Sequence, residues 1–424
     1  MVRKVKNLLK PALFRLYKCM KTLLGARFHT TRPEFPTQPY TFTRDDAKRI
    51  YNIVLSGKLN HRFGPETSLL EKEFATYHKT KYALATNSGT SALEMAVKAI
   101  GIKPGDEVIV PAYTFVATAQ AVLSRGGIPV FADIDDTFTL SPASALEKIN
   151  KRTKAIIVVH AFGNVADMDR ILGIAKRHNL FVIEDSCQAI GASYKGKKVG
   201  SLGDIGCFSF NETKAVYTGQ GGMLTTSNKK FYDIANITRE TGQIDIMLGS
   251  DVQTTGNTFA LTEMQAALAR SILGQLDNLN IRRKNNYELF TRIIGTEELP
   301  FRWYRILPEA GPSFSRLNFM VDFKKLRTTR NAFITRIQVQ GVPMKTFYPI
   351  PLYRYSLFQN RMDSLIHSSF PFNQNSHVQY KGMYLPFVEL FYKQQIGIDF
   401  SPYLTRDNII YFCTTFRNQM KSYR

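Results

Sequence analysis

Residues 208–218 read Phe-Ser-Phe-Asn-Glu-Thr-Lys-Ala-Val-Tyr-Thr and place Lys214 directly after a short apolar strand. The run Gly219-Gln220-Gly221-Gly222 follows, so a tight glycine-rich loop holds the lysine. Upstream, the apolar stretch 182–185 ends in the carboxylate of Asp185. A lysine amine and a strand-end aspartate are the pair with which proteins bind pyridoxal phosphate (PLP). This part of the sequence therefore predicts a PLP site on an α/β sheet.

The length and composition of the chain predict a folded protein of more than one domain. It has 424 residues, 44% of them hydrophobic, which is too long for one compact core. We expect a basic extension over residues 1–39, a large PLP-binding domain over 40–275 and a smaller α+β domain over 276–424. The four cysteines are far apart and the seven histidines lack metal-ligand spacing, which predicts no metal site and a reducing, cytoplasmic compartment.

The chain is strongly basic, with a formal charge of +22. The charge predicts a solvated surface that attracts anionic substrates, and no nucleic-acid-binding motif accompanies it. Residues 1–32 contain nine lysines or arginines and no acid, and one helical face would carry Leu9, Leu13, Leu16, Met20 and Leu23. The apolar runs of this stretch are too short and too interrupted by lysine to span a membrane. The stretch indicates peripheral membrane contact or targeting, and an extension without function is the alternative.

Short apolar runs alternate with helical patterns from about residue 40, which predicts a parallel sheet covered by helices on both faces. The expected strands cover residues 107–110, 128–133, 155–160, 181–185, 205–210 and 223–226. Helices over 91–100 and 167–178 would supply crossovers, and a long helical pattern runs from 263 towards 289. Beyond it we expect strands over 317–323 and 342–347 around a helix over 328–340.

Several polar or aromatic residues stand where predicted strands end, the edge at which open α/β sheets bind ligands. The Asn-Ser-Gly-Thr turn at 87–90 would offer the backbone N–H groups of a helix start to a phosphate. Each feature also has an ordinary explanation: a helix cap for the turn and for Asp185, and core packing for Phe115. Their combination with Lys214 favours a cofactor site. The candidates are Gly89, Thr90, Phe115, Asp185, Ser209 and Lys214.

The two central residues would have different tasks. A lysine in water has a pKa of about 10.4 and rarely loses its proton, so Lys214 needs burial to become a nucleophile. A carboxylate at Asp185 would keep the pyridine nitrogen protonated, which lets the ring draw electrons from the substrate carbon. Both requirements point to a buried pocket.

Motifs along the chain match, in order, those of a known family. They are Asn-Ser-Gly-Thr-Ser-Ala-Leu at 87–93, Pro-Gly-Asp-Glu-Val-Ile-Val-Pro at 104–111, Tyr-Thr-Phe-Val-Ala-Thr-Ala at 113–119, Ile-Glu-Asp-Ser-Cys-Gln-Ala at 183–189, the stretch 195–204 and the Lys214 segment. With them the chain resembles the DegT/DnrJ/StrS family of PLP-dependent nucleotide-sugar aminotransferases. The match is dense from about residue 57 to 268 and thins beyond 270, where 348–352 and 385–387 still resemble the family's small domain.

The resemblance implies a type I aminotransferase fold and a homodimer with active sites at its interface. PLP would be bonded to Lys214, with Asp185 on its pyridine nitrogen and Phe115 stacked on its ring. Gln188 would contact the 3-hydroxyl side, while Gly89, Thr90 and Ser209 hold the phosphate. The reaction would move an amino group, usually from glutamate, to the keto carbon of a nucleotide-linked sugar, commonly a 4-keto-6-deoxyhexose.

Two departures from the family pattern leave alternatives open. Many relatives carry Asn and Arg where this chain has Thr258 and Ala260, in a turn that reaches the partner's cofactor phosphate. Gln220 stands where glutamate is usual. A catalytically inactive or regulatory paralogue is therefore one alternative. A PLP-dependent sugar dehydratase is another, although those enzymes typically have histidine in place of Lys214. The sugar, the nucleotide and the ring position are set by loops, which the sequence does not decide.

Overall fold

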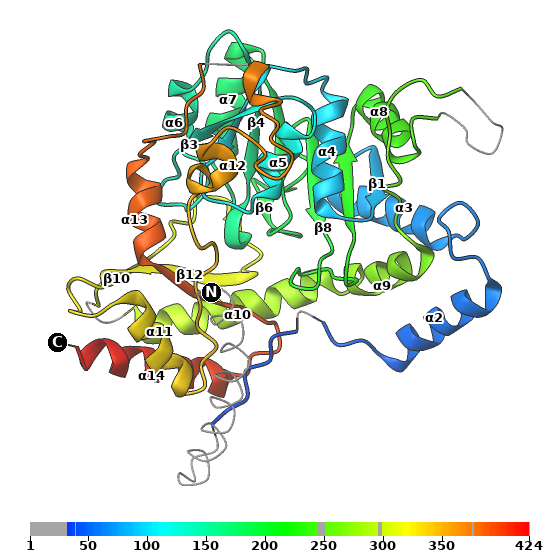
Figure 1. The fold of residues 1–424 in the computed structure, drawn as a ribbon. Helices are drawn as coiled ribbons and strands as arrows, with labels where there is room; N and C mark the ends of the chain where they lie inside the picture. Colours follow the sequence, from blue (N-terminus) through cyan, green and yellow to red (C-terminus); the bar gives the residue numbers. More distant parts are fainter. Residues whose placement is uncertain (1–31, 39, 244–250, 296–298, 375–376, 424) are drawn as a thin grey trace, which may run out of the picture.

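A seven-stranded sheet forms the centre of the protein in a computed structural model that describes residues 32–38, 40–243, 251–295, 299–374 and 377–423 (Figure 1). The strand order is β1-β9-β8-β5-β4-β2-β3, and only β9 runs antiparallel to its neighbours. The strands are β1 (Tyr82–Thr86), β2 (Glu107–Pro111), β3 (Ile128–Ala132), β4 (Thr153–Val159), β5 (Phe181–Asp185), β8 (Ile205–Ser209) and β9 (Gly222–Thr226). The mostly parallel sheet confirms the α/β class expected from the sequence.

Helices cover both faces of this sheet, and β4 shows how the sequence provides for it. Successive side chains of a strand point to opposite faces. Ile157 and Val159 pack in the cluster that includes α4 and α5, whereas Ile156 and Val158 pack in the cluster of α7. A continuous apolar run is the result. The helices of this part are α2 (Arg44–Ser56), α3 (Glu66–His78), α4 (Gly89–Ala99), α5 (Ala117–Leu123), α6 (Pro142–Glu147), α7 (Met168–His178), α8 (Lys229–Arg239) and α9 (Glu263–Leu273).

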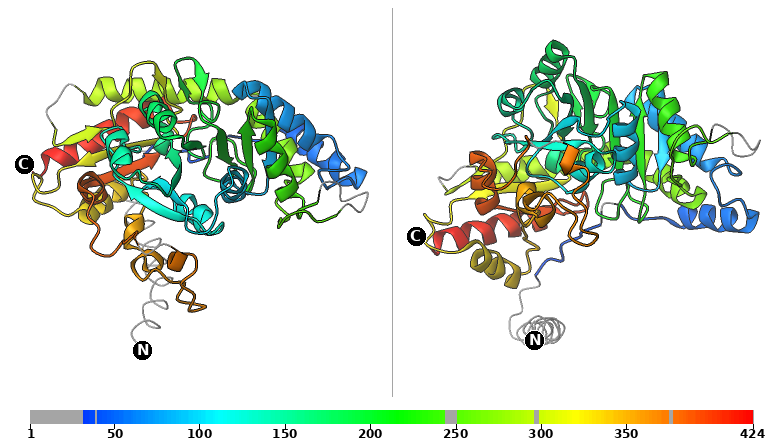
Figure 2. Two further views of the ribbon diagram at one scale, coloured as in Figure 1. Left: turned by 90° about the horizontal axis from the view of Figure 1, so that it is seen from above. Right: turned by 45° about the horizontal axis from the view of Figure 1, so that its top comes forward.

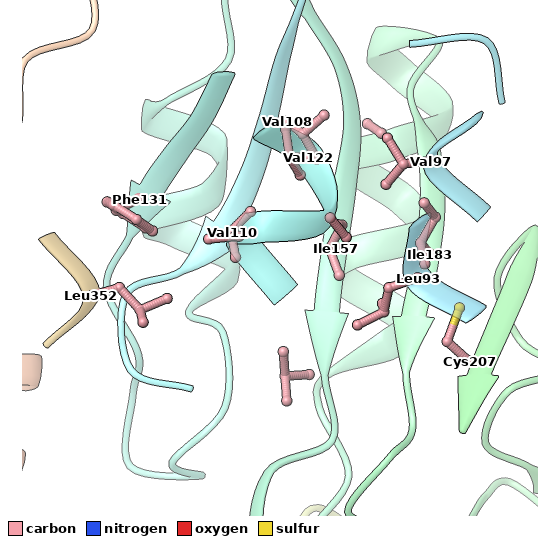
Figure 3. Packing of buried hydrophobic residues seen from close by; sticks show 14 of the residues in the cluster. Leu93, Val97, Val108, Val110, Val122, Phe131, Ile157, Ile183, Cys207 and Leu352 are labelled. Atoms are coloured by element: carbon pink, nitrogen blue, oxygen red, sulfur yellow. The ribbon is translucent and has the colours of Figure 1, made fainter. Parts of the chain in front are cut away.

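Helix α4 is the central helix on one face of the sheet. Ser88 caps its start, because the Ser88 Oγ accepts a hydrogen bond of 3.0 Å from the Ser91 amide. Leu93 and Val97, one turn apart, lie over the sheet beside Ile157 and Ile183 (Figure 3). The core thus fixes the helix so that its N-terminus lies at the carboxyl ends of the strands.

The C-terminal part forms a second, smaller layer. Its sheet has the order β10-β12-β13, entirely antiparallel, and packs with α10, α11 and α14 around an aromatic-rich core. Figure 2 shows this part, yellow to red, beside the main sheet, with α2 on the opposite side. The elements are α10 (Leu276–Ile294), β10 (Phe301–Trp303), β12 (Arg316–Val321), α11 (Arg330–Val339), β13 (Gln395–Asp399) and α14 (Arg406–Lys421).

Residues between α11 and β13 pack on the large sheet. The Tyr380 hydroxyl donates to the Pro129 carbonyl at 2.8 Å, and the Asp133 carboxylate accepts from the Phe387 and Val388 amides at 2.9 and 2.8 Å. The domain boundary at residue 276 stays a prediction. The remaining elements are short: β6 (Ser193–Tyr194), β7 (Lys197–Lys198), β11 (Ala310–Gly311), α12 (Ser356–Gln359), α13 (Pro386–Gln394) and the 3₁₀ turns Ala161–Gly163, Leu352–Arg354 and Phe372–Gln374.

Two expected elements differ in the structure. The strand expected over 342–347 is reduced to a single bridge between Lys345 and Gly397, because Pro343 has no N–H and the Phe347 amide bonds the Gln395 side chain. The long helical pattern after residue 262 is two helices, since α9 ends at Leu273 and α10 starts at Leu276. The break follows Gly274, a poor helix former, and lies at Gln275, whose φ of −110° and ψ of −1° depart from the helix.

The basic amphipathic helix expected over residues 1–32 lies almost wholly outside the described residues. From Arg32 the chain runs along the C-terminal part, where the Asn408 side chain donates to the Glu34 carbonyl at 2.8 Å and Ser401 Oγ to the Gln38 carbonyl at 2.7 Å. Within the described ranges, none of the helices has the length and apolar character needed to cross a bilayer.

Candidate active site

A cavity of about 400 Å³ opens where the carboxyl ends of the parallel strands meet. All seven residues predicted from the sequence line it: Gly89, Thr90, Phe115, Asp185, Gln188, Ser209 and Lys214. They come from α4, the β2–α5 loop, β5 and the loop after it, the end of β8 and the β8–β9 connection, so only the fold brings them together. Their individual roles toward a cofactor stay predictions.

The β8–β9 connection fixes Lys214 at one wall of the cavity. The Lys214 amide donates to the Asn211 carbonyl at 2.9 Å, and the Phe210 amide donates to the Gly221 carbonyl at 2.7 Å. These bonds close the loop tightly. Burial, followed by the positive charge of Arg316, lowers the pKa of Lys214 below its ordinary value of 10.5. The amine is therefore closer to its neutral, nucleophilic form than a surface lysine.

Asp185 faces the cavity and is buried. One carboxylate oxygen accepts from the Thr118 hydroxyl at 2.8 Å and the other from the Cys187 amide at 3.2 Å. Its neighbour Glu184 points to the opposite face, where it lies 2.9 Å from Nε2 of the buried His160. Two adjacent carboxylates thus have separate surroundings. Asp185 alone is presented to a ligand.

The start of α4 forms a cradle for an anion. The Ser91 amide is taken by Ser88 Oγ, which leaves the Gly89 and Thr90 amides, without intrahelical partners, at the cavity wall beside Ser209. A Cβ added to Gly89 would lie 2.7 Å from the Cβ of Ser209, and one added to Gly222 would lie 2.6 Å from the Ser88 carbonyl oxygen. Only glycine permits this close approach, so the cradle is built for backbone donors.

Gln188 and Phe115 border the same space in different ways. The Gln188 Oε1 accepts from the Phe162 amide at 3.0 Å, which fixes its side chain. Phe115 lines the cavity and is 57% exposed, so its ring is accessible to a ligand. Together with the cradle, the buried Asp185 and the Lys214 amine, these residues fit PLP: an anion site, a carboxylate, an aromatic wall and an amine surround one cavity. Among the described residues, no group of three His, Cys, Asp or Glu side chains is placed to hold a metal ion.

The turn with Thr258 and Ala260 lies next to the cradle of its own chain. The Asn87 side chain donates to the Thr258 carbonyl at 3.2 Å, and the Asn87 amide to the Phe259 carbonyl at 2.7 Å. The Thr258 side chain is exposed. The contact between this turn and a partner subunit's cofactor stays a prediction.

Other residues of the site were not found from the sequence. Cys187 and Tyr348 line the cavity, and Thr118 orients Asp185. All three lie within the family-like motifs, so these motifs are the signal that could have identified them. Arg316 also lines the cavity. It lies in the part where the resemblance is weak, and nothing in its sequence context separates it from other basic residues.

The comparisons with known proteins agree with this geometry. The model of the DegT/DnrJ/EryC1/StrS aminotransferase family matches residues 41–396. The spore coat polysaccharide biosynthesis protein SpsC of Bacillus subtilis is 31% identical over 379 residues, 86% of this chain and 92% of that protein. A UDP-N-acetyl-3-dehydro-alpha-D-glucosamine 3-aminotransferase of Acidithiobacillus ferrooxidans is 36% identical over 305 residues, 70% of this chain and 78% of that protein.

A solved structure shows the same fold. The aminotransferase from Psychrobacter cryohalolentis superimposes with a TM-score of 0.81 at 29% identity and covers 92% of this chain and 99% of its own. The type I aminotransferase fold expected from the sequence is confirmed by this similarity.

The lowered pKa of Lys214 gives a stability prediction for the cofactor-free protein. In the unfolded chain Lys214 has its ordinary pKa of 10.5. At pH values between the lowered pKa of the folded protein and 10.5, unfolding therefore takes up a proton. Folding stability therefore falls as the pH falls through this window. We expect Lys214→Met to raise the thermal unfolding midpoint near pH 7, with a gain that shrinks toward pH 10.5. Calorimetry at several pH values measures it.

The matched control is Lys324→Met, which removes an exposed lysine. It should leave the free energy of unfolding within about 0.5 kcal/mol of the wild-type value, and so the midpoint nearly unchanged. A lower midpoint for Lys214→Met than for wild type at pH 7 would contradict the assigned burial of the amine.

Proposed function

The chain belongs to the DegT/DnrJ/EryC1/StrS aminotransferase family and is a PLP-dependent sugar aminotransferase, and we propose that its acceptor is a nucleotide-linked keto sugar, a 4-keto-6-deoxyhexose, with glutamate as the amino donor. The observation that carries the proposal is the single cavity in which Lys214, Asp185 and the start of α4 meet. The name of the relative from Acidithiobacillus ferrooxidans describes a UDP-linked keto sugar as its substrate, which supports the nucleotide-sugar class.

The residues of this chain divide the work of transamination. PLP, when bound, supplies an electron sink that lets an amino group leave one carbon and join another. Lys214 takes the proton from the substrate carbon and returns it, a task for which its lowered pKa suits it. Asp185, oriented by Thr118, would keep the pyridine nitrogen protonated. The Gly89 and Thr90 amides would bind the phosphate. The presence of both central residues favours turnover over an inactive paralogue.

A substrate panel tests the proposal. Purified enzyme with PLP is incubated with glutamate or glutamine and with dTDP-, UDP- and GDP-linked 4-keto-6-deoxy sugars, alongside a UDP-linked 3-keto sugar. Mass spectrometry should detect an amino sugar from a 4-keto substrate with glutamate. Lys214→Ala is the control and should lose about 10²–10⁴-fold or more of the rate, because the proton carrier is gone. Amination of the 3-keto sugar alone would contradict the proposed ring position.

A homodimer with active sites at its interface is a further part of the proposal. Large apolar side chains are exposed on α2 and the loop after it: Tyr51 (61%), Val54 (51%), Leu55 (68%), Leu59 (41%) and Phe63 (57%). Such a gathering of exposed apolar side chains is typical of a protein interface. Figure 1 shows α2 at the edge of the molecule. A second copy of the chain is the occupant we propose for this surface.

Charge placed on α2 should separate the subunits. We expect Leu55→Glu to shift the mass measured by light scattering from dimer toward monomer and to lower activity, because the interface has an apolar core. Val339→Glu, at an exposed apolar residue of α11, is the matched control and should stay dimeric. An active wild-type monomer at working concentration would refute the dimer.

The location of the protein in the cell stays a proposal as well. We propose a cytoplasmic enzyme whose basic residues 1–32 contact an anionic membrane surface. Binding of the full chain to anionic vesicles, compared with a chain lacking residues 1–32, decides this. Equal binding of the two would contradict it.

A further inference from the structure

Arg316 is the first residue of β12, the central strand of the C-terminal sheet. Its backbone pairs with Asp399 of β13, so both the strand and its neighbour fix the position of the side chain. The side chain is 13% exposed and lines the same cavity as Lys214 and Asp185. The C-terminal part of the chain thus contributes a guanidinium, together with Tyr348, to a cavity whose other lining residues come from the part built around the large sheet.

The polar contacts that hold this guanidinium are long. Its Nε lies 3.5 Å from Oδ1 of Asp399, and its Nη1 lies 3.5 Å from Oε1 of Gln188, both at the outer limit of a hydrogen bond. The guanidinium carbon lies 4.6 Å from the centre of the Phe347 ring, and a hydrogen bond joins Arg316 to Tyr348. Stacking on Phe347 orients the planar group, while none of these contacts is a short, two-pronged bond to a carboxylate.

The charge around Arg316 is not balanced by its acidic neighbour. Asp399 also pairs with Lys345 through its other oxygen, so one carboxylate serves two cations. Among the described residues that line the cavity, Lys214 and Arg316 are the cations and Asp185 is the acid. Because Lys214 and Asp185 are assigned to the cofactor, Arg316 is the cation left to attract an anionic substrate group.

Three anionic groups could reach the cavity during the reaction: the α-carboxylate next to the reacting carbon of glutamate, the side-chain carboxylate two methylene groups away from that carbon, and the diphosphate of the nucleotide sugar. Arg316 and Lys214 also border a second space of about 10 Å³, which places the two side chains close together. The donor's α-carboxylate is bonded directly to the carbon that reacts at Lys214. The diphosphate is separated from its keto carbon by the sugar ring. Proximity to Lys214 therefore favours the α-carboxylate.

We propose that Arg316 binds the α-carboxylate of the amino donor, with its two outer N–H groups directed at the two carboxylate oxygens. The proposal rests on the proposed function, because it names the group that recognises the donor in that reaction. Arginine suits this task, since its planar fork matches a carboxylate and its charge is permanent. The binding would exchange the long contacts to Gln188 and Asp399 for short ones.

The experiment compares wild type with Arg316→Gln, Arg316→Lys and the control Arg305→Gln, which breaks an exposed ion pair with Asp136 outside the cavity. Each PLP-loaded protein is mixed with L-glutamate or with isoglutamine, in which the α-carboxylate is an uncharged amide, and the absorbance of the cofactor reports the half-reaction. Calorimetry then measures binding of glutarate, as a carboxylate probe, and of UDP, as a diphosphate probe.

We expect Arg316→Gln to weaken glutamate use and glutarate binding about 10- to 100-fold, the value of a charge-assisted hydrogen-bonded pair. Wild type should prefer glutamate to isoglutamine, and Arg316→Gln should lose that preference. Binding of UDP should change less than about 3-fold. Arg316→Lys keeps the charge without the planar fork, so its glutamate use and glutarate binding should lie between those of wild type and Arg316→Gln. Arg305→Gln should match wild type.

Three results would overturn the proposal. The first is an unchanged preference for glutamate over isoglutamine in Arg316→Gln. If Arg316→Gln does not fold, the second is a preference for glutamate in Arg316→Lys that equals the preference of wild type. The third is a loss of UDP binding as large as the loss of glutarate binding, which would assign Arg316 to the diphosphate. The glutamate half-reaction needs no sugar, so failure of every sugar in the panel would refute the proposed acceptor and leave this test intact.

Discussion

The buried carboxylate of Glu184 at the end of β5 is the constraint on which the site depends. It accepts the backbone N–H groups of Gly200, Leu202 and Gly203 at 2.8, 2.7 and 2.6 Å, and it pairs with His160. These bonds fix the turn that leads into β8, and β8 leads to Ser209 and Lys214. Loss of one partner of such a buried network costs about 3–5 kcal/mol.

The same strand end carries both structural and chemical functions because side chains alternate along a strand. Glu184 faces the turn before β8, and Asp185 faces the cavity. The charged side chains that line the cavity are less fully hydrogen-bonded than Glu184, which supports them. Lys214 and Arg316 are like charges at one cavity, and burial followed by the charge of Arg316 makes the protonated form of Lys214 less favourable. A site of this kind sacrifices stability in the empty protein and gains it when an anionic ligand binds.

The sequence predicted the parts of the fold whose signals are local. The apolar runs of β4 and β5, the cap at Ser88 and the Lys214 loop all appear where they were expected. It did not predict β1, whose Tyr-Ala-Leu-Ala-Thr sequence has few β-branched residues, or β13, where Gly397 is needed because a Cβ there would lie 2.3 Å from the Leu317 carbonyl oxygen. Arg316 could not be predicted, because a residue far along the chain reaches the cavity only through the pairing of β12 with β13.

The central claim is that the cofactor is bonded to Lys214, and trapping tests it most directly. Borohydride makes the bond between PLP and a lysine permanent, and peptide mapping by mass spectrometry then locates the modified residue. We expect one modified peptide, containing Lys214, in wild type, and none in Lys214→Ala. A label on a different lysine of the native protein would show that Lys214 does not hold the cofactor.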